Sequence, residues 1–121
     1  MSKKLQKRII YIDGGTRNSN ICMVDGDKTI VTYKKKSPTN NELEYLALLY
    51  ALGYVRDKYP SKEILIYSDS MLVVNQMNGK WRVTTESLIP FHDKCTRIKT
   101  SKIKIKWISR VFNRAGWVLD F

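Results

Sequence analysis

Two short apolar runs, each ending in an aspartate, place the strongest constraint on how this chain folds. Residues 8–15 read RIIYIDGG and residues 63–69 read EILIYSD, so both runs are rich in β-branched and aromatic side chains. Such runs predict strands that are buried on both faces and lie centrally in a sheet. Helices are then needed to cover the sheet on either side.

The segments between and after these runs predict the remaining elements. Residues 21–24 and 29–33 resemble strands, and the Asp-Gly pair at 25–26 indicates a hairpin between them. Helices are expected over about 40–58, 70–77 and 86–100, followed by a strand within 102–109 and a short final helix. The order predicts one α/β domain, residues 1–121, with a mixed sheet and helices packed on it.

The chain is strongly basic, with 22 Lys and Arg against 11 Asp and Glu and a net charge of +11. This charge favours a polyanionic partner such as nucleic acid, although a merely soluble basic surface is the alternative. No apolar run approaches the ~20 residues of a membrane-spanning helix, and the start of the chain lacks a signal-peptide cleavage pattern. A cytoplasmic monomer without membrane contact is expected.

The cysteines and the single histidine do not form a recognisable metal or redox motif. Cys22 and Cys95 lie far apart in the sequence, so buried free thiols are favoured over the alternative of a disulfide. His92 falls within an expected helix, where a surface or packing role is favoured.

Asp13 and Asp69 end the two central strands, and each is in phase with a tyrosine, Tyr11 or Tyr67, two residues earlier. Ligands in open α/β sheets commonly bind beyond the carboxyl ends of parallel strands, so two acids at this place indicate a site. The alternative is that each aspartate caps a turn or a helix.

Two glutamates at the start of the first helix differ in register. Thr39 and Glu42 fit a capping box, which gives Glu42 a structural role. Glu44 instead heads a stripe that faces the sheet and continues with Ala47, Leu48, Ala51 and Val55. The alternative makes Asn41 the cap and Glu44 its partner in the box.

Three carboxylates brought together would repel one another and raise one another's pKa values. Divalent cations remove this conflict, and oxygen ligands without a His or Cys set favour Mg²⁺ or Mn²⁺ over zinc. Two such ions about 4 Å apart can activate a water and stabilise a leaving oxygen in phosphodiester cleavage.

Four stretches in this order resemble type 1 ribonuclease H. They are YIDGGTRN with Asp13, TNNELEYLALLYAL with Glu44, IYSDSMLVVNQMNG with Asp69, and KWISRVFNRAG near the end. The resemblance implies a five-stranded mixed sheet with three antiparallel and two parallel strands, flanked by helices. It also implies hydrolysis of the RNA strand of an RNA/DNA hybrid with two Mg²⁺ ions, or Mn²⁺ in their place, leaving 3′-hydroxyl and 5′-phosphate ends.

The resemblance also implies roles for individual residues. Asp13, Glu44 and Asp69 match three of the four acidic metal ligands of the family. Gly14 and Gly15 match the turn where the backbone approaches the RNA, which a missing Cβ permits. The positions that match polar contacts to the hybrid, through side chains or nearby backbone, are Asn40, Asn41 and Asn75.

The end of the chain departs from the family pattern, because no acid stands where N-x-x-A-D-x-L-A places the fourth ligand. Asn113 is the favoured replacement as a catalytic metal ligand through its amide oxygen, and Asp120 is the rival, about 10 Å further along the helix. A third interpretation gives Asn113 only a helix-capping role. The preceding loop lacks the family's histidine and offers Arg110 as its charged residue.

The basic helical handle of some family members is also missing. Substrate binding is then expected to rely on Lys80, Trp81 and other scattered basic residues, including a basic tail at residues 1–7 that can be disordered, and to be weaker and more salt-sensitive than with the handle. Two other functions stay open: a hybrid-binding module without catalysis, and a nuclease of the same fold that acts on DNA or belongs to a reverse transcriptase. The chain's own Met1 favours a free-standing enzyme.

Overall fold

The computed structural model describes residues 7–15, 19–33 and 39–120. The strands are β1 (Arg8–Gly15), β2 (Asn20–Asp25), β3 (Lys28–Tyr33), β4 (Ile64–Ser68) and β5 (Ile103–Trp107). The helices are α1 (Asn40–Lys58), α2 (Met71–Met77), α3 (Ile89–Ile98) and α4 (Arg114–Asp120), with 3-10 turns η1 (Glu86–Leu88) and η2 (Arg110–Phe112). The predicted basic tail lies outside these residues, apart from Lys7.

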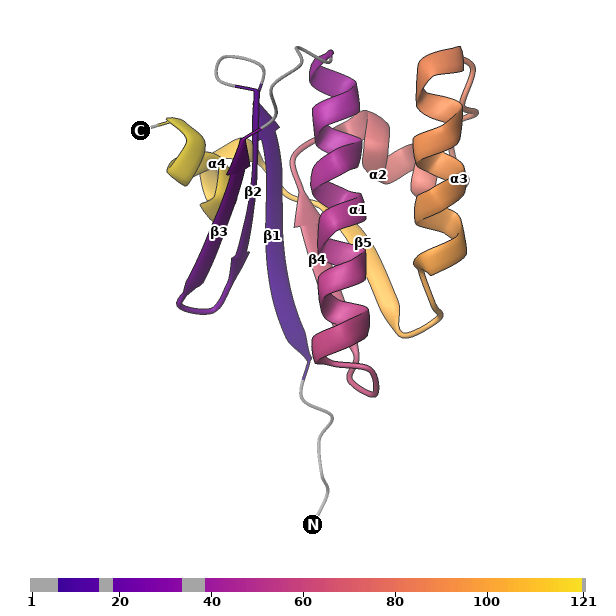
Figure 1. Cartoon of the computed structure of the whole chain (residues 1–121). Helices are drawn as coiled ribbons and strands as arrows, with labels where there is room; N and C mark the ends of the chain where they lie inside the picture. The colour runs from indigo at the N-terminus through magenta and orange to yellow at the C-terminus, as the bar shows by residue number, and fades with distance from the viewer. Residues whose placement is uncertain (1–6, 16–18, 34–38, 121) are drawn as a thin grey trace.

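One five-stranded sheet organises the chain, in the order β3-β2-β1-β4-β5 (Figure 1). The first three strands pair antiparallel, and β4 joins β1 and β5 in parallel. Gly26 adopts a φ of +61° in the β2–β3 turn, a conformation that glycine reaches without strain. The predicted mixed sheet is therefore confirmed, and β1 and β4 direct their carboxyl ends to the same edge.

The main core lies between the sheet and the helices α1, α2 and α3. Figure 1 shows α1 and α3 side by side on this face. The predicted stripe of α1 is fully buried there against Ile10, Ile12 and Ile66 of the central strands. Across the described helices, none has the length and apolar character needed to cross a lipid bilayer.

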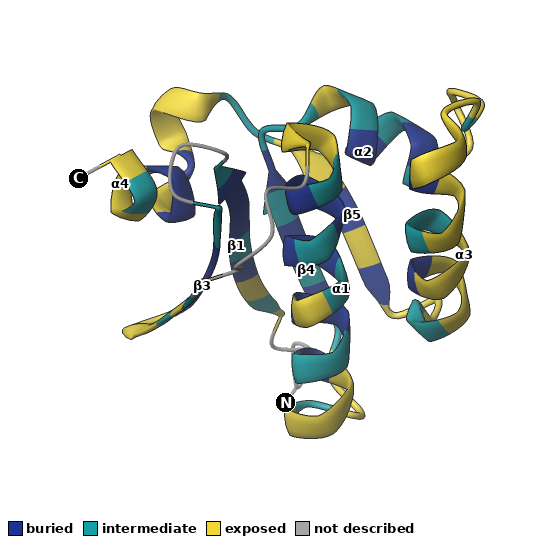
Figure 2. Ribbon diagram, turned by 45° about the horizontal axis from the view of Figure 1, so that its top comes forward, coloured by how far each residue is buried: buried dark blue, intermediate teal, exposed yellow. Residues whose placement is uncertain are grey.

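The opposite face of the sheet is covered only in part. There α4 packs on β1 and β2, forming a small cluster around Cys22, Val24 and Ala115. Beyond this cover Ile9 is 43% exposed, and Leu65 and Tyr67 are half-buried. Figure 2 shows buried and exposed stretches alternating along β5. The prediction that both central strands are buried on both faces is therefore wrong for this second face, because a seven-residue helix is too short to cover β4 and β5.

The two cysteines and the histidine occupy structural positions. Cys22 and Cys95 are buried and unpaired, as predicted. His92 is half-buried, with its ring edge-on to Tyr45 and its Nε2 atom 3.3 Å from the carbonyl oxygen of Gln76. This environment confirms a packing role for the histidine.

Candidate metal centre

Three carboxylates from separate elements meet at the carboxyl edge of the sheet. Asp13 comes from β1, Glu44 from α1 and Asp69 from the residue after β4. One oxygen of each lies within 4.8 Å of the others. Asp13 is 2% exposed and Glu44 is 5% exposed, so these acids sit in the interior rather than on a solvated surface. The convergence predicted from the sequence is therefore present.

The start of α1 places Glu44 in the cluster. The Thr39 hydroxyl accepts from the Glu42 amide at 3.2 Å, and the Glu42 carboxylate accepts from the Thr39 amide at 3.3 Å. This is the predicted capping box, so the alternative with Asn41 as the cap is wrong. Glu44, not needed at the cap, accepts a hydrogen bond of 3.2 Å from the Gly14 amide.

Gly14 allows the helix and the central strand to approach closely. A Cβ atom at this position would lie 2.5 Å from the carbonyl carbon of Leu43 and 2.8 Å from the Glu44 amide nitrogen, which backbone atoms cannot relieve. At Gly15 a Cβ atom would lie 3.7 Å from the Leu119 side chain, an ordinary contact. The glycine at 14 therefore has a packing role that brings Glu44 to Asp13, whatever role it has toward RNA.

Asp69 belongs to the cluster rather than to a helix cap. Ser70 is the residue that caps α2, accepting from the Val73 amide at 3.2 Å. The Asp69 side chain is 8% exposed and receives a hydrogen bond of 2.9 Å from the side-chain amide of Asn113. The capping alternative for this aspartate is therefore wrong.

Asn113 is fully buried, and its hydrogen bonds fix the orientation of its amide. Its nitrogen donates to the Ile12 carbonyl at 2.9 Å, and its oxygen accepts from the Ala115 amide at 3.1 Å. A carbonyl can only accept and a backbone N–H can only donate, so oxygen and nitrogen cannot be exchanged. The oxygen that was predicted to bind metal caps α4, and the nitrogen faces Asp69. Asn113 thus has a capping and positioning role, and its role as a fourth metal ligand stays a prediction.

Arg110 links the cluster to the end of α4. Its guanidinium donates to Asp120 at 2.9 Å and lies 3.7 Å from the Asp69 carboxylate. Asp120 is half-exposed, yet it lines the same hollow as the acids. The hollow has a volume of about 220 Å³ and is lined by Asp13, Gly14, Gly15, Asn40, Glu44, Arg110, Leu119 and Asp120.

Burial and mutual repulsion shift the protonation of the acids. Burial, and then the charge of Asp69, raises the pKa of Asp13 to about 7. Burial, followed by the charges of Asp13 and Asp69, raises the pKa of Glu44 to about 9. Burial disfavours the charged form of Arg110, but the neighbouring carboxylates outweigh it and raise the pKa of this guanidinium. The cluster therefore holds protons at neutral pH unless another cation replaces them.

The donor atoms fit a divalent metal ion. Asp13 Oδ1 is buried and has no hydrogen-bond partner among the described residues. An unpartnered carboxylate oxygen in the interior is costly unless a cation meets it. The nearby donors are carboxylate oxygens, which suit Mg²⁺ or Mn²⁺ better than zinc.

The other predicted substrate contacts divide into two groups. Asn40 lines the acidic hollow, and Asn41 is exposed beside it at the start of α1. Asn75, at the end of α2, accepts backbone hydrogen bonds from Lys80 at 2.9 Å and from Trp81 at 3.1 Å. These last three residues therefore form a separate surface group, which no described contact joins to the acids.

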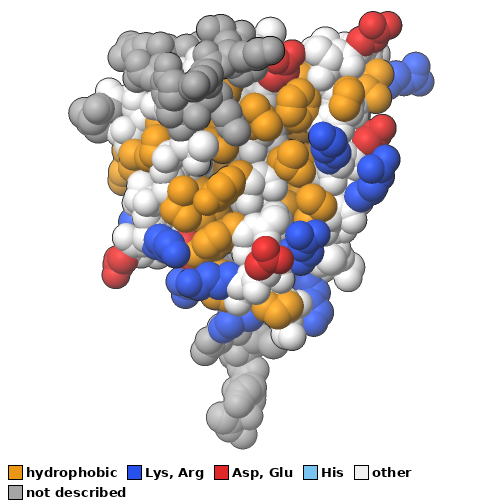
Figure 3. All heavy atoms as spheres, viewed as in Figure 1, with side chains coloured by type: hydrophobic (Ala, Val, Ile, Leu, Met, Phe, Trp, Pro, Cys, Tyr) orange, Lys and Arg blue, Asp and Glu red, His pale blue; other side chains and the backbone are white. Residues whose placement is uncertain are grey.

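A larger hollow lies elsewhere, on the outer side of α1. It has a volume of about 710 Å³ and is lined by Leu49, Tyr50, Gly53, Tyr54, Asp57 and Lys58. Figure 3 shows the hydrophobic side chains that gather on this face of the molecule, with basic side chains around them. The lining of this hollow contains a single acid, Asp57, so the hollow offers no cluster of carboxylates for a metal ion despite its size.

Sequence reasoning missed the positioning roles of Asn113 and Arg110, and also the role of Gly116. A Cβ atom at Gly116 would lie 3.5 Å from the Asp13 carboxylate and 3.6 Å from that of Asp69. The small residue thus leaves α4 close to both acids. The spacing Asn113-x-x-Gly116, one helical turn, is the signal that could have indicated a shared inward face.

Comparisons with known proteins agree with this geometry. A family described as reverse transcriptase-like matches residues 17–119. The structure of LC11-RNase H1, isolated from compost by a metagenomic approach, is 31% identical with a TM-score of 0.81, over 93% of this chain and 91% of that chain. The crystal structure of LC11-RNase H1 in complex with an RNA/DNA hybrid matches at 29% identity and a TM-score of 0.78, over 88% of each chain.

A longer relative extends the comparison. The bifunctional protein Rv2228c of Mycobacterium tuberculosis is 27% identical in an alignment of 119 positions, which covers 88% of this chain and 32% of that protein. The chain thus spans about a third of the length of this curated relative. By its fold and its sequence, the chain therefore belongs to the reverse transcriptase-like family and to the type 1 ribonucleases H.

Proposed function

We propose that this protein hydrolyses the RNA strand of RNA/DNA hybrids with two divalent metal ions and leaves 3′-hydroxyl and 5′-phosphate ends. The observation that carries the proposal is the buried, unpartnered oxygen of Asp13 beside Glu44 and Asp69. A relative that is similar over most of the chain has been crystallised with such a hybrid, which supports the substrate. Mg²⁺ is the proposed ion, with Mn²⁺ as a substitute.

The residues of the cluster have distinct proposed roles. Asp13, Glu44 and Asp69 hold the metal ions, which when bound activate a water and stabilise the departing oxygen. The Gly14 amide fixes one oxygen of Glu44, and the Asn113 amide fixes one oxygen of Asp69. These hydrogen bonds orient the donors before any ion binds, as supporting residues do around metal sites generally.

Substrate binding follows from the residues around the hollow. Gly15 and Asn40 line it, so we assign them, with the neighbouring Asn41, to contacts with the RNA strand near the acids. Contacts to 2′-hydroxyl groups are the physical means of distinguishing RNA from DNA. Asn75, Lys80 and Trp81 form the second group, which we assign to the backbone of the hybrid at a distance from the cut.

Cleavage of an end-labelled RNA/DNA hybrid tests the proposal. The hybrid is incubated with Mg²⁺, Mn²⁺ or EDTA, beside RNA/RNA and DNA/DNA duplexes of the same sequence. We expect cleavage of the hybrid alone and only with metal, with a loss of at least 10³-fold in the Asp13→Asn variant, because the ions are the main source of transition-state stabilisation. No metal-dependent cleavage of the hybrid would reject the proposal, and cleavage of DNA/DNA would redirect it to a DNA nuclease.

One observation favours a second function, a hybrid-binding module without catalysis. The oxygen of Asn113 is used by the helix cap, and no acid stands at the fourth ligand position of the family pattern. The same assay separates the two functions, because a binding module retains hybrid affinity in EDTA but never cuts. The sequence-based expectation of a cytoplasmic monomer stays a prediction, which sedimentation and cell fractionation can test.

A further inference from the structure

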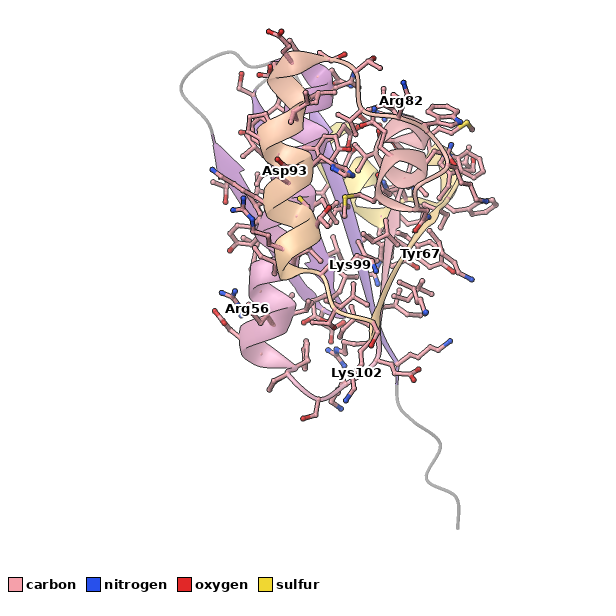
Figure 4. The ribbon with its side chains drawn as sticks, turned by 90° about the vertical axis from the view of Figure 1, so that its right-hand side faces the viewer. Arg56, Tyr67, Arg82, Asp93, Lys99 and Lys102 are labelled. Atoms are coloured by element: carbon pink, nitrogen blue, oxygen red, sulfur yellow. The ribbon has the colours of Figure 1, made fainter. Side chains whose placement is uncertain are left out.

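The uncovered half of the sheet carries a stack of aromatic rings. Tyr11 and Tyr67 are directly opposite each other in the parallel β1–β4 pair, so their side chains emerge on the same face. Their ring centroids are 5.6 Å apart with an interplanar angle of 26°. The Arg114 guanidinium lies 5.7 Å from the centroid of Tyr11. Figure 4 shows Tyr67 on the side of the sheet away from α1 and α3.

The stack is open on the side of Tyr67. Tyr11 stacks against one side of this ring, and within the described part of the chain no second ring or cation stacks on Tyr67. The ring is only half-buried, since α4 covers β1 and β2 but not β4. Another planar group could therefore extend the stack towards β5.

Basic side chains border the stack on β5. Lys104 is paired with Leu65 and Lys106 with Tyr67, so both lysines emerge on the face of the tyrosines, and both are exposed. A hollow of about 380 Å³ beside them is lined by Lys7, Glu63, Ile64, Leu65, Ser101, Lys102, Lys104 and Lys106. A second hollow, of about 250 Å³, is lined by Lys7, Arg8, Ile9, Tyr11, Gly26 and Arg114. Glu63 is the only acid in either lining.

We propose that this open sheet face, defined by Tyr11, Tyr67, Lys104 and Lys106, binds single-stranded nucleic acid. A base would stack on the free side of Tyr67, and the adjoining phosphates would meet the two lysines. Aromatic platforms bordered by cations are the general solution for single strands, because every base has a π-face and every nucleotide a charge. The excess of cations over Glu63 matches this occupant.

The position of the platform relates it to the acids. Tyr11 precedes Asp13 by two residues on β1, and Tyr67 precedes Asp69, the residue after β4, by two residues, which is about 7 Å along the sheet. A single strand held here could run on into a hybrid at the acidic edge. Binding itself needs neither metal nor catalysis, so the inference does not depend on the proposed hydrolysis.

Fluorescence anisotropy with labelled dT15 in EDTA and 50 mM salt tests the platform. Tyr67→Leu removes the ring and keeps apolar bulk, and its control is Tyr50→Leu on the outer side of α1, where Tyr50 is 38% exposed. Lys104→Gln with Lys106→Gln removes two charges, and its control is Lys94→Gln with Arg97→Gln on the exposed face of α3. Circular dichroism melts check that each variant is folded.

We expect Tyr67→Leu to weaken binding about fivefold or more, as removal of one stacking contact does. The double glutamine variant on β5 should weaken binding on the order of tenfold and lower the slope of log K against log salt by about 1.4, for two phosphate contacts. Both control variants should bind like the unmodified protein.

Equal binding by the β5 variant and its α3 control would overturn the platform, as would unchanged binding by folded Tyr67→Leu. Binding of an acidic, apolar peptide instead of dT15 at this face would overturn it in favour of a protein partner. A protein that binds dT15 as expected but never cuts a hybrid would reject only the hydrolysis, and the reverse result would reject only the platform.

Discussion

The side-chain amide of Asn113 donates a hydrogen bond of 2.9 Å to the carboxylate of Asp69, across 44 residues of sequence. The same side chain caps α4 through its oxygen and donates to the Ile12 carbonyl of the central strand. One buried residue thus ties the last helix, the first strand and the acidic cluster together. Its replacement is expected to affect both the stability of the fold and the geometry of the metal site.

Replacing Asn113 should separate its positioning role from that of a metal ligand. Asn113→Ala removes a cap and buried hydrogen bonds, so it should lower the free energy of unfolding by about 2–4 kcal/mol in urea titrations. Mn²⁺ affinity, measured by calorimetry, should fall about 10–100-fold, as it does when a supporting residue is lost. Asp120→Ala, at a half-exposed position, should change stability by less than about 0.5 kcal/mol and keep most of the activity. If Asn113→Ala kept full activity and Asp120→Ala lost its activity, Asp120 would be the fourth ligand.

The two neighbouring glycines should respond differently to alanine. Gly14→Ala drives a Cβ atom into the backbone of α1, so the helix must shift and Glu44 moves away from Asp13. The free energy of unfolding should fall by about 2 kcal/mol or more, and the cleavage activity should fall with it. Gly15→Ala meets only the Leu119 side chain at 3.7 Å, so its melting temperature should stay within about 3 °C. If Gly15 contacts the RNA, the Gly15→Ala variant should have a higher KM for the hybrid while its fold is unchanged. Equal melting temperatures for both variants would contradict the packing role of Gly14.

Without metal, the acidic cluster should make stability fall as pH rises. The pKa of Asp13 rises from an ordinary 3.8 to about 7, and that of Glu44 from 4.5 to about 9. The folded state then retains protons that the unfolded state releases, so this stability is complete below pH ~4 and is lost as pH rises through 7 and 9. The Asp13→Asn variant should lack the part of this pH-dependent stability that comes from Asp13, which is on the order of 2–4 kcal/mol.

Thermal melts in EDTA between pH 5 and pH 9 measure this effect as the difference between the unmodified protein and Asp13→Asn. Above pH 7 the variant should be the more stable of the two in EDTA, and Mg²⁺ should raise the melting temperature of the unmodified protein only. A difference that does not change with pH would show that Asp13 is ionised without metal.

The surface group at the end of α2 should contribute affinity for the hybrid rather than chemistry. Lys80→Gln is expected to raise the KM for an RNA/DNA hybrid, leave kcat unchanged, and lower the salt slope of binding by about 0.9, which is one phosphate contact. Lys94→Gln on α3 is the matched control and should change neither quantity. A change in kcat with Lys80→Gln would place this lysine nearer the acids than the structure does.

The sheet and the three acids were predictable because they depend on local patterns. Hydrophobic runs ending in Asp13 and Asp69, and the capping box that leaves Glu44 on the sheet-facing stripe, are readable within a few residues. Parallel pairing of β1 and β4 then brings the acids to one edge. The family resemblance added the substrate, which no local pattern contains.

The features that were missed depend on contacts between distant segments. The role of Asn113 depends on Ile12, 101 residues earlier, and the need for Gly14 depends on how closely α1 approaches. The exposure of Tyr67 depends on where α4 ends, although the apolar run around it indicates burial on both faces. Sequence periodicity gives the direction of a side chain but not what covers it.

The hydrogen bond between Asn113 and Ile12 also bears on the order in which the site forms during synthesis. Asp13, Glu44 and Asp69 leave the ribosome long before Asn113, and the nascent chain can bring them together once β4 pairs with β1. Asp69 then still lacks the amide that orients it. A chain that has not been completed past residue 113 can therefore gather its acids but cannot fix them, so correct geometry at the acidic edge arrives only once Asn113 has been made.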